Sequence, residues 1–189
     1  MFSLLRPSPQ RIDRFLDAAR ELPLSYAPIG LARRADYGFS VDEHVAVVGS
    51  GGAAFTRAAT ALAEWRHFDV GWVELFPKGA SIAPGTVVAV LARHVGFWSL
   101  NGCRIVYTIG APAGSDFGFA YGTLTNHAES GEEIFEISRR PETGEISYRI
   151  RAVSRQRAAL AKLGSPVARA LQRRFRHDSA RALARAIAG

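Results

Sequence analysis

Apolar and polar residues alternate along several stretches in the middle of the chain, as expected for strands that bury one face of a sheet. Turns rich in glycine and proline separate seven such stretches. The predicted strands cover residues 36–48, 70–76, 86–93, 98–109, 117–123, 132–138 and 146–153.

Three other stretches space their apolar residues three and four positions apart, the pattern of an amphipathic helix. A short helix is predicted over residues 8–20, with Ser8 as its cap and Pro9 in its first turn. A second helix is predicted over residues 53–66, between the first two strands. A long helix is predicted over residues 164–187, where Ser165 and a following proline form a further helix start.

This order of elements predicts an α+β fold, in which a curved, seven-stranded antiparallel sheet grips the long C-terminal helix. Such an arrangement buries both the sheet face and the apolar stripe of the helix. The space between helix and sheet is then the natural place for a ligand. We expect one domain over residues 1–189, with an N-terminal extension (1–35), the sheet with its inserted helix (36–153, helix 53–66) and the C-terminal helix (164–187).

The composition is that of a globular protein, with 48% hydrophobic and 22% charged residues among 189. The single cysteine, Cys103, excludes an intrachain disulfide and any multi-cysteine metal site. No run of 18 apolar residues is present, and the first residues lack the basic region of a secretory signal. We therefore expect a cytoplasmic protein with no transmembrane segment, no cofactor and no dedicated metal site, and leave its oligomeric state open.

The positive charge belongs to the C-terminal quarter of the chain. Residues 139–189 hold 13 basic and 3 acidic side chains, although the whole chain carries a net charge of only +7. Arg169, Arg173 and Arg176 of the long helix are candidate contacts for an anionic partner, with a solvated helix face as the alternative. Because these arginines are not interleaved with aromatic residues and no zinc-finger or helix-turn-helix spacing occurs, we do not expect a nucleic-acid partner.

Several short motifs together resemble an uncharacterised family labelled domain of unknown function 1990, or UPF0548. The resemblance spans roughly residues 24–180 and is most specific from Tyr121 to Phe135. It implies the helix-grip fold of the START-like superfamily, which includes the birch pollen allergen, and it implies no activity. The motifs are Leu24-Ser25-Tyr26, Gly30, Gly49-Ser50-Gly51, Trp65, Tyr121-Gly122-Thr123-Leu124, His127, Ser130-Gly131-Glu132-Glu133, Phe135 and Ser154-Arg155.

Candidate chemistry concentrates around the loop before the sixth strand, where His127 and Glu129 precede Glu132 and Glu133. Strand alternation sends Glu132 and Glu133 to opposite faces, with Glu133 on the apolar face beside Phe135. A carboxylate there needs a partner. Three interpretations remain open: an ion pair with Arg149 or Arg151, a ligand contact, and a catalytic base or metal ligand.

The fifth predicted strand alternates large aromatic residues with Gly118, Ala120 and Gly122. Glycines in a strand indicate that something approaches that face closely: the long helix, another layer or a bound molecule. Core packing is the alternative to a ligand role for the large aromatic residues. The residues expected to line a ligand cavity or its mouth are Trp72, Trp98, Tyr121, Glu133 and Phe175.

These observations support three hypotheses of function. The first is a START-like protein that binds a small apolar or amphipathic ligand between sheet and helix, with Tyr121 and Glu133 orienting one polar group. The second is an enzyme that acts in the same cavity, with His127, Glu133 and Tyr121 as weak candidates for acid–base groups. The third is an interaction protein that docks an anionic partner through its basic C-terminal helix.

Overall fold

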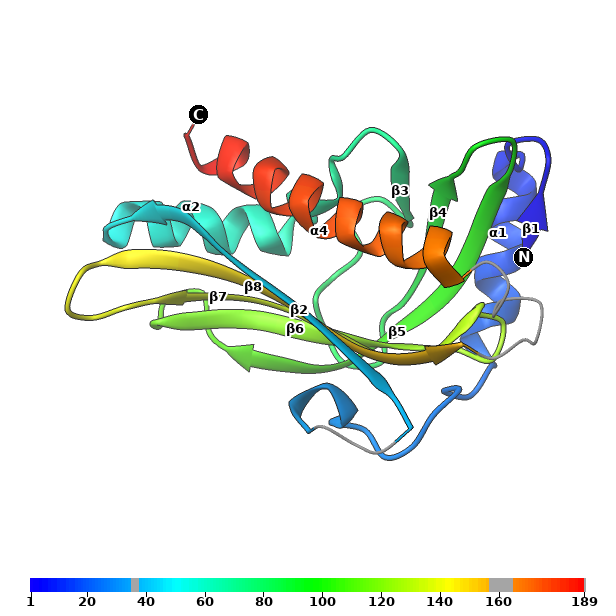
Figure 1. The fold of residues 1–189 in the computed structure, drawn as a ribbon, viewed down its shortest axis with the longest axis horizontal. Coiled ribbons are helices and arrows are strands. Elements are labelled where there is room, and N and C mark those ends of the chain that lie inside the picture. Colours follow the sequence, from blue (N-terminus) through cyan, green and yellow to red (C-terminus); the bar gives the residue numbers. More distant parts are fainter. Residues whose placement is uncertain (35–37, 157–164, 189) are drawn as a thin grey trace.

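The computed structural model describes residues 1–34, 38–156 and 165–188, with the side chains of residues 156 and 165–169 left undescribed (Figure 1). One strongly curved sheet carries α2 and α4 on its inner face and α1 on its outer face. The elements are β1 (Phe2–Ser3), α1 (Pro9–Arg20), the 3-10 helix η1 (Leu31–Arg33), β2 (Ser40–Ser50), α2 (Gly52–Ala63), the 3-10 helix η2 (Arg66–Phe68), β3 (Val73–Phe76), β4 (Val87–Arg93), β5 (Trp98–Gly110), β6 (Asp116–Thr123), β7 (Glu129–Arg139), β8 (Glu145–Gln156) and α4 (Ser165–Ala188).

The seven predicted strands are all present, in the antiparallel order β2-β8-β7-β6-β5-β4-β3. A two-residue strand, β1, also pairs with β5. The largest errors in the predicted boundaries are at four strand ends: β2 begins at Ser40, β3 begins at Val73, β7 begins earlier, at Glu129, and β8 continues to Gln156. These strand ends are set by pairing with neighbouring strands, which the alternation of a single strand does not reveal.

Two helix predictions show how local signals specify helix ends. Ser8 caps α1 as predicted, because its hydroxyl accepts a hydrogen bond from the backbone N–H of Arg11. The second helix ends at Ala63 rather than at residue 66, because Trp65 adopts a left-handed conformation with φ of 60°. The long helix is found at Ser165–Ala188, and the predicted cap at Ser165 lies outside the described side chains.

The main core lies on the inner face, between the sheet and the two helices α2 and α4. Alternation along the strands sends Phe117, Phe119 and Tyr121 of β6 to this face. The opposite residues of β6 face outward, where Gly122 and Ala120 meet the N-terminal extension.

The N-terminal extension covers much of the outer face of the sheet. Helix α1 packs on β4 and β5 through Ile12 and Leu16, and Tyr26 lies against Gly122, where a Cβ atom would collide with the tyrosine hydroxyl. The close approach predicted from the glycines of this strand at Gly122 is therefore made by the chain's own extension.

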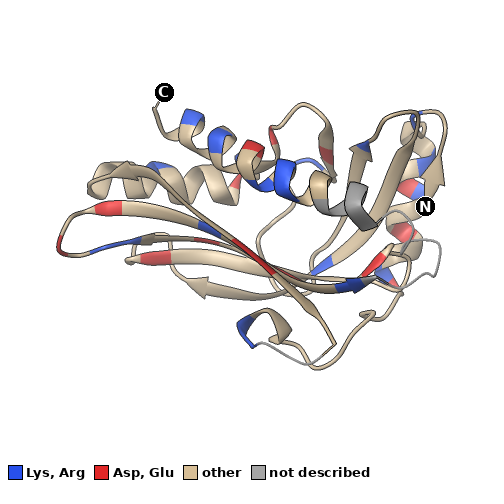
Figure 2. Ribbon diagram, in the orientation of Figure 1, with Lys and Arg blue, Asp and Glu red and all other residues tan. Residues whose placement is uncertain are grey.

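None of the helices in the described ranges combines the length and hydropathy needed to cross a bilayer. Basic residues recur along α4 (Figure 2), and Arg173, Arg174, Arg181 and Arg185 are exposed. The apolar stripe of this helix, with Leu183 and Ile187, is buried in the core.

Candidate functional site

The inner face of the sheet is divided into an aromatic end and a polar end. At the aromatic end, beneath α2 and α4, rings pack around the fully buried His67 in stacked, tilted and edge-to-face pairs. The ring of His67 lies 4.9 Å from Phe135 and 5.6 Å from Trp65, measured between centroids. Both of its nitrogens lack a hydrogen-bond partner among the described residues, and burial lowers its pKa to about 3. His67 is therefore a neutral core residue at physiological pH.

The polar end is centred on Glu133 of β7. The hydroxyl of Tyr121, on the neighbouring strand, donates a hydrogen bond of 2.7 Å to Oε2 of Glu133. Burial raises the pKa of Glu133 to about 7, although the hydrogen bond from Tyr121 acts in the opposite direction. The Glu133 side chain is nevertheless only half-buried, so it keeps some accessible surface. A carboxyl group in this state takes up or releases a proton near neutral pH.

A second carboxylate, Glu129, lies at the start of the same strand and is also half-buried. It accepts a hydrogen bond of 2.9 Å from the side-chain amide of Gln172 on α4 and one of 3.1 Å from the hydroxyl of Ser154. Burial raises its pKa as well. Both donors are neutral, so they satisfy oxygen atoms of Glu129 without cancelling its charge.

Arg176, a cation whose charge lowers the pKa of Glu133, is already engaged in an ion pair. Arg176 of α4 is 6% exposed and forms an ion pair with Asp42 on β2. Beside this pair, the rings of His44 and His177 lie 4.5 Å apart and join the same two elements. The contribution of Arg176 to an anion-contacting face was therefore predicted wrongly, because its side chain turns inward to hold α4 against β2.

The predicted ion pair between Glu133 and Arg149 or Arg151 is also wrong. Glu133 pairs in register with Ala152, so both arginines point to the other face of the sheet. There Arg149 bonds Glu136 and Glu43, and Arg151 bonds Glu43 and the carbonyl of Ala32. The inner face at Glu133 receives a tyrosine hydroxyl in place of a guanidinium.

Glu132, which faces outward as the alternation predicts, is a structural hub. It is 2% exposed and accepts hydrogen bonds from the hydroxyls of Tyr26 and Tyr107 at 2.6 and 2.7 Å. The backbone N–H groups of Gly30 and Ala32 donate to it at 2.9 and 3.1 Å. Glu132 thus fastens the N-terminal extension to the sheet. Sequence reasoning missed this role because the donors in the extension lie 100 or more residues away.

Besides Tyr121, the three other aromatic residues expected around the cavity lie in different places. Phe175 is half-buried on the inner face, with its ring 5.1 Å from Phe68 and 6.3 Å from Trp72. Trp72 is buried in the same core, and its indole N–H donates to Asp178 on α4 at 3.0 Å. Trp98 lies on the opposite face of the sheet, in the cluster that packs against α1, so its expected place in the cavity between sheet and helix was wrong.

The remaining predicted site residues lie at the edges of this region. His127 is half-buried in the loop before β7, where its Nδ1 accepts a hydrogen bond of 2.9 Å from the backbone N–H of Glu129. Arg173 is exposed on α4, and the side chain of Arg169 lies outside the described part of the chain. Sequence reasoning missed Asp42 and Gln172. In the sequence, each of them is simply a polar residue next to a stretch whose apolar residues face inward.

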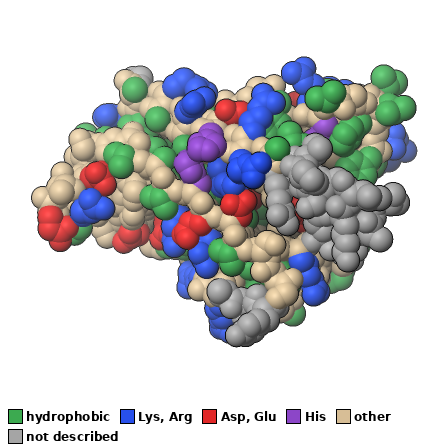
Figure 3. Space-filling view, in the orientation of Figure 1, with side chains coloured by type: hydrophobic (Ala, Val, Ile, Leu, Met, Phe, Trp, Pro, Cys, Tyr) green, Lys and Arg blue, Asp and Glu red, His purple; other side chains and the backbone are tan. Residues whose placement is uncertain are grey.

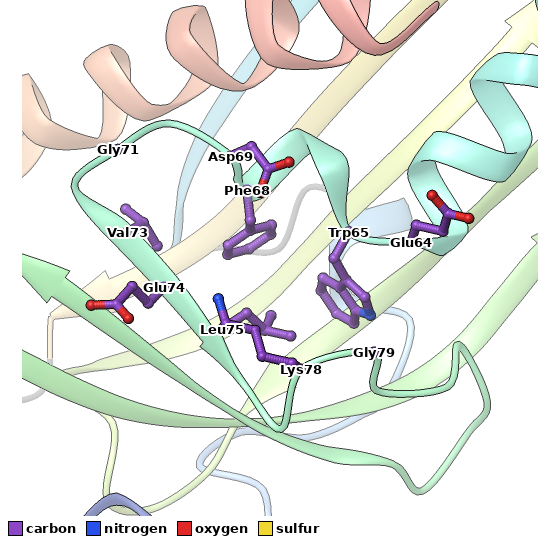
Figure 4. A pocket seen from close by; sticks show the side chains of 10 residues that line it. All are labelled: Glu64, Trp65, Phe68, Asp69, Gly71, Val73, Glu74, Leu75, Lys78 and Gly79. Carbon is purple, nitrogen blue, oxygen red and sulfur yellow. The ribbon is translucent and has the colours of Figure 1, made fainter. Parts of the chain in front are cut away.

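A surface cavity of about 400 Å³ opens between the end of α2, η2 and β3 (Figure 4). Its apolar wall is formed by Trp65, Phe68, Val73 and Leu75, and Lys78 stands at its rim with three acidic residues. The lining has no member in common with the five residues predicted to line a ligand cavity. Its full lining is Glu64, Trp65, Phe68, Asp69, Gly71, Val73, Glu74, Leu75, Lys78 and Gly79.

Comparison with known proteins identifies relatives over nearly the whole chain. Residues 25–182 match the model of a family described as a domain of unknown function, DUF1990. A UPF0548 protein of Dictyostelium discoideum is 33% identical over 207 residues, covering 99% of this chain and 96% of its own. A UPF0548 protein of Deinococcus radiodurans is 34% identical over 201 residues, covering 98% of each chain.

Solved structures with the same architecture are much more distant in sequence. The protein TTHA0849 from Thermus thermophilus aligns with a TM-score of 0.54 at 10% identity, over 78% of this chain and 97% of its own. A point mutant of norcoclaurine synthase from Thalictrum aligns with a TM-score of 0.51 at 10% identity, over 82% and 97%. These likenesses confirm the predicted START-like helix-grip fold and leave function to the individual side chains.

Proposed function

The chain belongs to the DUF1990 family, whose description states no function, and from the polar end of its inner face we propose that it binds a small amphipathic molecule between the sheet and α4. The observation that carries this proposal is Glu133, a carboxyl group on the inner face that keeps accessible surface and whose described hydrogen bond comes from Tyr121. Carboxylates enclosed by protein need partners, and a ligand with a donor group supplies one.

The surrounding side chains indicate which kind of molecule suits the site. Leu171 and Phe175 of α4, together with Val90 and Ala92 of β4, are half-buried apolar residues packed against the inner core. They suit an apolar ligand body. The carboxyl groups of Glu129 and Glu133 suit a hydrogen-bond donor or a cation, such as an amine, because the donors described around them are neutral.

Native mass spectrometry of the protein purified from its own host, followed by denaturing extraction, tests the proposal. We expect a small molecule near one-to-one occupancy, and reduced occupancy in the Glu133→Gln variant. The matched control is Glu136→Gln, on the same strand but the outer face, where the carboxylate bonds Arg149. Equal occupancy in the two variants would exclude Glu133 as the contact.

If the ligand is lost during purification, a titration with fluorescent probes tests whether the site binds such a molecule. The uncharged probe N-phenyl-1-naphthylamine combines an apolar body with an N–H donor, whereas anilinonaphthalene sulfonate has a similar body with a negative charge. We expect the uncharged probe to bind more tightly, because a sulfonate meets the carboxylates of Glu129 and Glu133. A bare protein mass together with no saturable probe binding contradicts the proposal.

A second candidate function is proton-transfer catalysis at the same place. The pKa of about 7 for Glu133 is the observation that favours it, because a general acid or base works best with a pKa near the working pH. The Tyr121 hydroxyl would then orient the reacting group. The test is turnover of the co-purified molecule, with a rate per bound molecule that falls in Glu133→Gln. Turnover that persists in that variant contradicts this second candidate.

A further inference from the structure

The outward side of α4 carries a diagonal row of basic residues. Residues four positions apart are neighbours on a helix surface, each turned by about 40° from the last, and Arg173, His177, Arg181 and Arg185 follow this spacing and are all exposed. We call these four residues the cationic ridge; its length is about 18 Å. Within the described part of the chain, its three arginines have no hydrogen-bond, ion-pair or ring partner. None of the described residues neutralises their charge.

A group of large apolar residues is exposed at another place, where β1 meets the β4–β5 turn. Phe2, Leu4 and Leu5 are 63%, 81% and 80% exposed, and Val95 at the tip of the turn is fully exposed. We call these four residues the apolar tip. Pairing of β1 with β5 and the contact of Phe2 with Phe97 at 5.9 Å hold the two segments together. Single exposed apolar residues are ordinary, but a group at one protruding corner indicates an interaction site.

The cationic ridge and the apolar tip share one edge of the molecule. In the space-filling view, basic side chains over the C-terminal half of α4 and hydrophobic side chains at the β1 end lie along the same upper edge (Figure 3). In this view, a flat surface laid along the edge meets both groups. A bilayer surface is flat on the scale of this protein.

We propose that this edge docks on the surface of a membrane that contains anionic lipids. The arginines of the ridge contact lipid headgroups, and the side chains of the tip enter the boundary between headgroups and acyl chains. The inference is independent of the proposed ligand site, because it uses exposed residues on the outward side of α4 and at the β1 corner, and none of the residues that face Glu133.

Charge and side-chain type favour a membrane over two other partners. A second copy of this chain would bring two cationic ridges together, which is unfavourable. A single-stranded nucleic acid would use the arginines, but three of the four residues of the apolar tip have no ring on which a base can stack. The fourth residue, Phe2, offers a single ring, which already contacts Phe97. Only the membrane surface engages both groups.

Vesicle co-sedimentation of the full chain tests the proposal. The probes are vesicles of phosphatidylcholine alone and vesicles of phosphatidylcholine mixed with phosphatidylserine. We expect binding to the mixed vesicles, weakening as salt is added, and little binding to phosphatidylcholine alone. Absence of binding to the mixed vesicles, or equal binding to both kinds, overturns the proposal.

Two sets of variants separate the ridge from the tip. Replacing the three ridge arginines by glutamine weakens partitioning roughly a hundredfold, at about fivefold for each residue. Replacing Leu4, Leu5 and Val95 by serine weakens partitioning about tenfold or more. The substituted positions are exposed, so thermal melting should show that both variants remain folded.

Matched controls remove the same charge and the same apolar surface elsewhere. For the ridge, Arg11, Arg14 and Arg34 are replaced by glutamine; for the tip, the exposed Val41, Val45 and Val47 of β2 are replaced by serine. Both controls should bind mixed vesicles like the wild type. Controls that lose as much binding as the test variants overturn the proposal. A single-stranded RNA oligonucleotide gives a further test. The proposal is also overturned if the protein binds this RNA tightly and does not bind vesicles, and if RNA binding is lost in the ridge variant but kept in the tip variant.

Discussion

Glu132 and Glu133 are adjacent in the chain, yet the sheet places them in two very different surroundings. On the outer face, Glu132 is 2% exposed and accepts four hydrogen bonds, from two tyrosine hydroxyls and two backbone N–H groups. On the inner face, Glu133 is half-buried, and its described hydrogen bond comes from Tyr121. Both are acidic residues on one strand, so the difference comes entirely from what the fold brings to each face.

The comparison separates a carboxylate that holds the fold from one that suits a ligand. A carboxylate has about four acceptor positions, and the four donors at Glu132 use them all. Glu132 therefore contributes to stability and has no capacity left for another molecule. Glu133 keeps both acceptor capacity and accessible surface. Its burial makes the ionised form of the carboxyl group unfavourable.

The largest expected effect is the loss of stability in Glu132→Ala. The substitution leaves two tyrosine hydroxyls and two backbone N–H groups in a buried place without their acceptor. We expect the free energy of unfolding to fall by about 4 kcal/mol, since hydrogen bonds to charged groups are strong and unpaired buried donors are costly. Urea denaturation monitored by circular dichroism measures this change.

Glu136→Ala is the control for that experiment, since Glu136 lies on the same strand and face, at the protein surface. Its ion pair with Arg149 is partly exposed, so its removal should cost about 1 kcal/mol or less. A Glu132→Ala variant no less stable than Glu136→Ala contradicts the hub role of Glu132.

A smaller effect, with a distinct pH dependence, is expected for Glu133→Gln. The pKa of Glu133 in the folded state is about 7, above the value of 4.5 expected in the unfolded chain. Its contribution to stability is therefore complete below about pH 4.5 and is lost as the pH rises through about 7. The variant cannot ionise, so it should be about 3 kcal/mol more stable than the wild type near pH 8 and equally stable near pH 4.

Urea midpoints measured across this pH range give the difference between the two proteins. His67 also affects the stability of both, in the opposite sense: its folded-state pKa of about 3 lies below 6.5, so stability is lost as the pH falls from about 6.5 toward 3. Because His67 is present in both proteins, its effect cancels in the difference. A gap between wild type and variant that does not change with pH shows that Glu133 does not titrate in this range.

Sequence reasoning succeeded where the information is local. The alternation of Glu133 and Phe135 with Glu132 predicted the face of each residue, because successive residues of a strand point to opposite sides. The cap at Ser8 was predicted for the same reason, since the donor is only three residues away. The helix-grip fold followed from the order of elements and from the family resemblance.

Sequence reasoning failed where a contact depends on distant pairing. Arg149 and Arg151 were expected beside Glu133, but the register of β7 with β8 places Ala152 there. Trp98 was expected in the cavity, but the N-terminal extension covers the outer face and gives that tryptophan an apolar partner there. Arg176 was expected at the surface, and its burial depends on Asp42, 134 positions earlier in the sequence. None of these facts is visible in the local pattern.

The smallest expected effect is a change in the titration of Glu133 in Tyr121→Phe. The tyrosine hydroxyl favours the ionised carboxylate, so its removal should raise the pKa of Glu133 from about 7 by roughly one further unit. Carbon-13 NMR of labelled glutamate carboxyl groups measures this pKa directly. The control is Tyr148→Phe, which removes another buried inner-face hydroxyl, one that bonds Ser179. Its effect on Glu133 should be much smaller.

The titration of Glu133 also tests the proposed ligand site. A ligand that donates a hydrogen bond or a positive charge to Glu133 acts in the same direction as the Tyr121 hydroxyl, so the ligand should lower the pKa of Glu133. In Tyr121→Phe the ligand should partly restore the wild-type value. If Tyr121→Phe leaves the pKa of Glu133 unchanged, other donors already satisfy that carboxylate. Glu133 would then resemble Glu132, and the distinction between the two faces would no longer support a ligand site.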